Sequence, residues 1–111
     1  MANRGGFPGG GNMQQLMRQA QRLQEEMQRA QQQLQETEFE GFGGGDLVTV
    51  VLTGDKNLVS ININPNAVDL DDLEMLEDLI AAAFQDATEK IEEETQRVMG
   101  PYASMMGGMR F

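Results

Sequence analysis

Residues 46–64 read DLVTVVLTGDKNLVSININ, and this stretch decides the fold because it predicts a β-hairpin on its own. Its first half is rich in β-branched residues, which favour strands. Gly54–Asn57 supplies the turn, since glycine, aspartate and asparagine accept the backbone angles of tight turns. In the second half, apolar and polar residues alternate, so that Val59, Ile61 and Ile63 share one face. Asn64-Pro65 ends the strand.

A shorter strand is predicted just before the hairpin. Thr37 and Phe39 alternate with glutamates over residues 36–40, which indicates a strand with a charged outer face. The glycine-rich run Gly41–Gly45 is interpreted as a flexible turn that leads into the hairpin. The three strands form an antiparallel meander with one apolar face, and that face has to be covered by another element.

A long helix is predicted upstream, over residues 12–35. Asn12 and Gln15 have the spacing of a capping box. Apolar residues then recur in steps of three and four, the heptad pattern of a coiled coil. We call this row the seam; it consists of Met13, Leu16, Ala20, Leu23, Met27, Ala30 and Leu34. The helix is too long and too narrowly apolar to be covered by one small sheet, so we expect it to pack against another helix.

A second long helix is predicted downstream, over residues 71–99. Asp71 and Glu74 repeat the capping spacing, and acidic residues are favourable at the positive end of the helix dipole. Apolar residues keep helical spacing up to Val98. Gly100-Pro101 is predicted to end the helix.

The chain of 111 residues therefore divides into one domain and two ends. Residues 1–11 and 100–111 are rich in glycine and are predicted to be flexible tails, while residues 12–99 form the fold. A core of this size is marginal in a monomer, which favours self-association. No apolar run is long enough to span a membrane and no secretory signal is visible, so we expect a cytoplasmic protein without membrane contact.

The composition argues against an enzyme. There is no cysteine and no histidine, which removes thiol and imidazole chemistry and the usual zinc sites. Ser60 and Ser104 have no base nearby in the sequence. The acidic residues from Asp69 to Glu74 lack the spacing of a calcium loop and are explained by helix capping. We predict no catalytic residue, no metal, no cofactor and no small-molecule substrate.

Charge is unevenly distributed along the chain. Residues 1–29 hold four basic and two acidic residues, a net charge of +2, although the whole chain carries −10. Arg18, Arg22 and Arg29 fall on one stripe of the first helix, on the side away from the seam. The stripe has two interpretations. It is either a solvated face, with Arg22 paired to a nearby glutamate, or a surface that contacts the phosphates of a nucleic acid.

Several strings resemble the YbaB/EbfC family of bacterial nucleoid-associated proteins. They are NMQQLMRQAQ at 12–21, LTGD at 52–55, VSI at 59–61 with Asn64-Pro65, and DLEMLEDLIAAAF at 72–84. The resemblance implies a cytoplasmic homodimer associated with the nucleoid, with long helices that project as arms and bind DNA. It further implies effects on nucleoid organisation, gene expression or DNA repair. The cation of the N-terminal string that matches the family is Arg18.

We therefore predict an α+β homodimer of αβββα protomers, each with a three-stranded antiparallel sheet and two long helices. It is expected to bind double-stranded DNA through phosphate contacts of Arg18, Arg22 and Arg29, without sequence readout, because no recognition motif is visible. The alternative is a protein-interaction module in which the Gln- and Met-rich helix offers its seam to a partner helix. Substitutions in the seam and substitutions of the arginines distinguish these two hypotheses.

Overall fold

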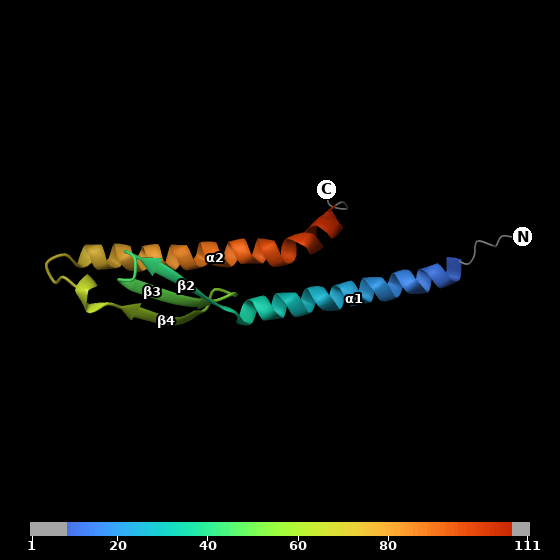
Figure 1. Ribbon diagram of the computed structural model, residues 1–111, viewed down its shortest axis with the longest axis horizontal. Helices are drawn as coiled ribbons and strands as arrows, with labels where there is room; N and C mark the ends of the chain where they lie inside the picture. Colours follow the sequence, from blue (N-terminus) through green and yellow to red (C-terminus); the bar gives the residue numbers. More distant parts are fainter. Residues whose placement is uncertain (1–8, 108–111) are drawn as a thin grey trace, which may run out of the picture.

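The computed structural model describes residues 9–107, and its element order is the predicted αβββα (Figure 1). Helix α1 (Gly9–Glu36) is followed by strands β2 (Glu38–Gly43), β3 (Val48–Thr53) and β4 (Leu58–Ile63). A short 3-10 turn (Pro65–Ala67) leads to helix α2 (Leu73–Gly107). The molecule is a rod of 87 × 25 × 16 Å, because both helices are much longer than the sheet. The predicted α+β protomer is confirmed.

The three strands form one antiparallel sheet in the order β2-β3-β4. The predicted β3–β4 hairpin is confirmed: Lys56 donates its backbone N–H to the Thr53 carbonyl at 2.8 Å, and it has a positive φ of 67°. The register shifts by one residue between Val51 and Leu52, so that Leu52 lies opposite Leu58. Leu58 therefore joins the face that carries Ile61, instead of the polar face that strict alternation predicts.

The interpretation of Gly41–Gly45 as a turn is wrong for its first half. Gly41 and Gly43 belong to β2 and are buried, while the turn begins at Gly44, whose φ is +62°. The reason is the close approach of α2. A Cβ built on Gly41 would come closer than 3.0 Å to the carbonyl oxygen of Ala83 and the amide nitrogen of Ala87. These glycines are therefore packing positions, where any side chain would push the helix off the sheet.

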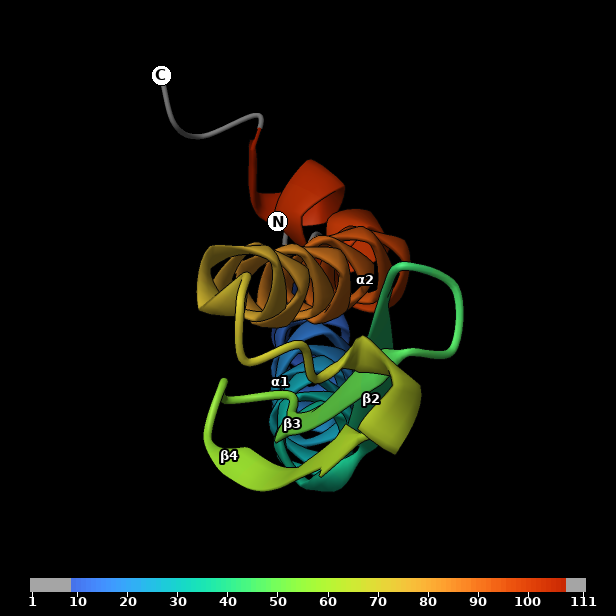
Figure 2. The same ribbon diagram turned by 90° about the vertical axis from the view of Figure 1, so that its left-hand side faces the viewer.

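Helix α2 covers one face of β2 and β3. Val48, Val50 and Leu52 of β3 pack against Ala83, Ala87 and Ile91 of α2, and all six side chains are buried. The alanines allow the close approach, and the larger side chains exclude water from the core. Leu58, Ile61 and Ile63 of β4 point to the same side as this core but remain 40–52% exposed. Figure 2 shows β4 at the margin of the sheet, away from α2.

The ends of both helices differ from the prediction. α1 begins at Gly9, so Asn12 lies inside the helix and does not cap it. α2 is capped by Asp72, which accepts the Met75 N–H at 3.2 Å, one residue later than predicted. Gly100-Pro101 does not end α2, which continues to Gly107 with Pro101 inside it. The last turns lean away from the axis in Figure 1, as expected where proline removes a helical hydrogen bond.

The two tails expected from the glycine content lie partly outside the described residues. Residues 1–8 and 108–111 fall there, whereas residues 9–11 and 100–107 are helical. In the part of the chain that the structure describes, no helix is long and apolar enough to cross a membrane.

Candidate nucleic-acid interface

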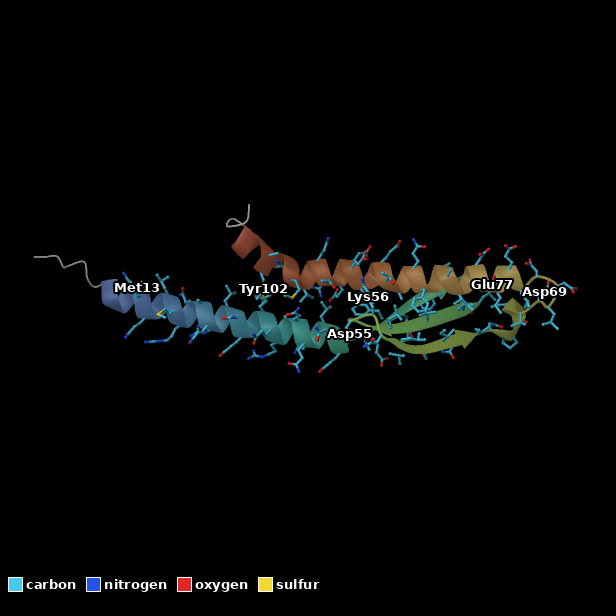
Figure 3. All side chains as sticks on the ribbon, turned by 180° about the vertical axis from the view of Figure 1, so that it is seen from behind. Met13, Asp55, Lys56, Asp69, Glu77 and Tyr102 are labelled. Carbon is cyan, nitrogen blue, oxygen red and sulfur yellow. The ribbon has the colours of Figure 1, made fainter. Side chains whose placement is uncertain are left out.

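Helix α1 projects as an arm from the rest of the molecule (Figure 1), and we call the sheet together with α2 the body. Its root is fixed where the chain enters the sheet: Leu34 is buried, and the backbone of Gly54 lies directly against the Leu34 carbonyl. From there the helix runs past the end of α2, with Met13 near its far end (Figure 3). Most of its side chains are exposed, so α1 offers a long surface that is free of the core.

The structure places Arg18, Arg22 and Arg29 on this exposed helix. Arg18 and Arg22 line one shallow hollow of about 270 Å³ together with Gln15 and Gln19. Arg29 lies two turns closer to the root, about 10 Å along the axis from Arg22 at 1.5 Å per residue. Guanidinium groups beside amide donors form a surface suited to phosphate oxygens.

Arg18, Arg22 and Arg29 make no ion pair within residues 9–107, unlike every other cation there. The predicted alternative of Arg22 pairing with a nearby glutamate is therefore not seen. Lys56 pairs with Glu92 at 3.7 Å. Arg97 donates to the Glu94 carboxylate, with Nε 2.9 Å from Oε1, and this partner raises the pKa of the guanidinium.

The remaining cation, Lys90, is held by the sheet. Its ammonium group donates to the Glu40 carbonyl at 2.8 Å, lies 3.3 Å from the Asp86 carboxylate, and sits 4.6 Å from the centre of the Phe42 ring. Lys90 therefore fastens α2 to the edge strand β2. The DNA-binding helices of the resemblance are not equivalent here, because only α1 carries cations without carboxylate partners in the described chain.

Asp86 completes this attachment. Its carboxylate accepts the Phe42 N–H at 2.9 Å, and this hydrogen bond, helped by Lys90 and opposed by partial burial, lowers the pKa of Asp86. A lowered pKa in the folded state stabilises the fold above the ordinary pKa of aspartate. That contribution is lost as the pH falls through the folded value.

Replacing Asp86 with asparagine is therefore expected to weaken the fold at pH 7 but not in acid. The amide still accepts the Phe42 N–H, so only the charge is lost, and the free energy of unfolding falls by less than about 1 kcal/mol. Urea unfolding at pH 7 and at about pH 2.5, below the ordinary aspartate pKa, measures this. A difference from wild type that is equal at both pH values would contradict the assignment.

The outer face of α2 has the opposite character to the arm. Glu89, Glu92 and Glu93 lie exposed around one open surface with Gln96. Within residues 9–107, no group of three metal-ligating side chains comes together. Asp69 accepts the Asp71 N–H at 2.9 Å, and Asp72 caps α2, so this acidic run is explained by local structure. Ser60 lies on β4 opposite Val51, and the side chain of Ser104 lies outside the described set.

One exposed surface was not predicted from the sequence, because the apolar face of the sheet was expected to be covered by another element. It is an apolar strip on β4, formed by Leu58, Ile61 and Ile63, which α2 leaves exposed. The alternation of residues 58–63 marked these side chains as apolar. Only the placement of α2 over β2 and β3 shows that they stay uncovered within one chain. We call these three residues the β4 strip.

Comparisons with known proteins agree on one family. The sequence model of the YbaB/EbfC DNA-binding family matches residues 9–106. A protein of Clostridium perfringens named "Nucleoid-associated protein" is 56% identical over 105 residues, covering 94% of each chain. One of the same name from Lachnoclostridium phytofermentans is 51% identical over 110 residues, covering 96% of this chain and 92% of its own.

A solved structure supports the fold independently. The crystal structure of an uncharacterized protein from Helicobacter pylori matches with a TM-score of 0.64, covering 80% of this chain and 94% of that one. The two sequences are 21% identical, so this likeness concerns the fold alone.

Proposed function

The chain belongs to the YbaB/EbfC DNA-binding family, and from this premise we propose that it is a nucleoid-associated protein whose homodimer grips double-stranded DNA with α1. Arg18, Arg22 and Arg29 contact phosphates, and no base is read. The protein works by binding, without catalysis or a cofactor, at the nucleoid in the cytoplasm. The names of its relatives from two clostridial species support the location.

One observation carries this proposal: the cations without a carboxylate partner in residues 9–107 all lie on the exposed arm. The outer part of α1, residues 9–24, contains two arginines and no acidic residue. The body, by contrast, is acidic and repels a polyanion. An arm that projects past the body therefore lets DNA approach the arginines while it stays away from α2.

The salt dependence of affinity tests the phosphate contacts. A labelled duplex of ~30 bp is titrated with protein between roughly 20 and 200 mM salt, and fluorescence anisotropy reports binding. Six arginines per dimer neutralise six phosphates, which predicts a log–log slope of about −5. No binding by the folded protein at the lowest salt, or a slope near zero, would contradict the proposal.

The β4 strip is the surface that supports dimer formation. It is a continuous apolar area on a strand that α2 leaves open, and burying it against a second copy removes apolar surface from water. A two-fold dimer uses the same patch on both chains, which suits a strip that is apolar throughout.

At the low protein concentrations of the DNA titration, replacing Ile61 with glutamate is expected to give a folded monomer, because Ile61 is already 40% exposed within one chain and the introduced charge would be buried only in the β4 dimer. The salt slope for DNA then falls to about −3, since three phosphates are contacted in place of six. Asn62→Glu places the same charge on the opposite face of β4 and is the control. Equal masses for the two variants would contradict the interface.

A further inference from the structure

The seam of α1 is bare over its outer half. Met13, Leu16 and Met17 are 59–64% exposed and form an apolar surface at the tip of the helix. Nearer the root, Leu23 and Met27 are half-buried against the end of α2. A row of apolar side chains this long is stable in water only when another helix covers it.

The inner half of the seam contains a groove. Ala20, Leu23, Gln24 and Met27 of α1 face Tyr102 of α2 across an open space of about 310 Å³. Figure 3 shows Tyr102 between the end of α2 and the arm. The groove is apolar, lies on the same side of α1 as the bare tip, and continues directly into it. Each chain therefore carries both an apolar helix tip and a groove that fits one.

We propose that the arms of two copies of this chain pair in antiparallel fashion, so that the tip of each lies in the groove of the other. In this register Ala20 faces Leu23 of the second copy, Leu16 faces Met27, and Met13 faces Ala30. Alanine opposes a large side chain in the first and third layers, which is how facing helices interdigitate without voids.

The charges on α1 fit this pairing. The positions that flank the seam hold Gln19, Gln24, Glu26 and Met17, so the flanking contacts are Met17 with Gln24 and Gln19 with Glu26. No like charges meet along the interface, and a glutamine amide can donate to the glutamate. The arginines lie on the opposite side of each helix, so both stripes stay open to DNA when the arms are paired.

Arm pairing goes beyond the proposed function, because it joins homodimers to one another. A chain with two self-complementary surfaces, the β4 strip and the seam, forms assemblies larger than a dimer. Such an assembly presents several arginine stripes at once. Several stripes on one assembly raise its overall affinity for DNA through effective concentration, without any new contact to the bases.

The mass in solution tests this with two substitutions. Leu16→Gln replaces an exposed apolar residue of the seam with a polar one that is also a good helix former. Ile61→Glu introduces a charge into the β4 strip. Light scattering after size exclusion should give more than two chains for wild type at high concentration, two for each variant, and one for the double variant. A wild type that stays at two chains, unaffected by Leu16→Gln, would overturn arm pairing. A monomeric Leu16→Gln variant, together with an Ile61→Glu variant that has the mass of wild type, would instead show that the arms form the dimer. It would contradict the proposed contact through the β4 strip.

Disulfide trapping tests the direction, since the chain has no cysteine of its own. Met13→Cys and Ala30→Cys, mixed and oxidised, should cross-link to each other, whereas Met13→Cys alone should not cross-link to itself. Arg18→Cys lies on the outer side of α1 and should cross-link to neither. Self-linking of Met13→Cys would indicate parallel arms and overturn the proposed register, as would no cross-link at all.

Discussion

Replacing Arg18, Arg22 and Arg29 together with alanine is expected to lower the affinity for double-stranded DNA by at least about a hundredfold at low salt and to flatten its salt dependence. The physical reason is counterion release: six neutralised phosphates per dimer dominate a complex that reads no bases. All three side chains are exposed, and alanine is the best helix former, so the fold and the mass should stay as in wild type.

The matched control for this result removes cations that have partners. Lys56→Ala/Arg97→Ala takes away two charges per chain from ion pairs on the body, and Arg18→Ala/Arg22→Ala takes away two from the arm. Fluorescence anisotropy should show a large loss for the arm variant and a small loss for the body variant. Equal losses would mean that net charge, and not the arm, governs binding.

Replacing Gly41 with alanine is expected to destabilise the fold by about 3 kcal/mol or more, at the upper end of the range for overpacked cores. The added Cβ would meet backbone atoms of Ala83 and Ala87, which cannot rotate away as a side chain can. α2 then has to move off the sheet and open its packing against Val50 and the other buried residues of β3. For a domain of this size, that is a large part of the total stability.

Gly100→Ala is the control, because a Cβ there meets nothing within 4 Å and the site is helical. It should leave the free energy of unfolding unchanged or raise it by up to about 1 kcal/mol, as measured by urea unfolding. A Gly41→Ala variant that unfolds at the same urea concentration as wild type would show that the helix can move at no cost.

The element order was predictable because each element has a local signal of its own. The hairpin of residues 46–64 combines β-branched runs with a turn sequence, and the seam repeats over three heptads. Two features were predicted wrongly because the prediction used local signals alone. Glycines at 41 and 43 indicate a turn when only their sequence neighbours are considered. In the structure they are required by the close approach of α2, some forty residues later in the chain. At Pro101, the local signal for a helix end is outweighed by continued helical hydrogen bonding, and only a bend remains.

Part of the candidate site was predictable from the sequence: the position of the arginines, but not their lack of carboxylate partners within residues 9–107. The spacing of Arg18, Arg22 and Arg29 predicts that they lie on one side of a helix, and in the structure all three are exposed on α1. The partners of two of the other cations are distant in the sequence: Lys90 contacts the Glu40 carbonyl fifty residues away, and Lys56 contacts Glu92. Arg97 pairs locally, with Glu94. No pattern along the chain gives the two distant partners, Glu40 and Glu92. The uncovered β4 strip is also a property of tertiary packing.

The most direct test of the central claim is to ask which surface touches DNA. A photocrosslinker is attached to a single cysteine introduced either at Gln15, beside the arginine hollow, or at Gln96, among the glutamates of α2. Both positions are exposed, so labelling should leave the fold intact. Irradiation with a duplex should give a protein–DNA adduct from Gln15→Cys and none from Gln96→Cys. An adduct from the α2 position with none from the arm would contradict the assignment of DNA binding to α1.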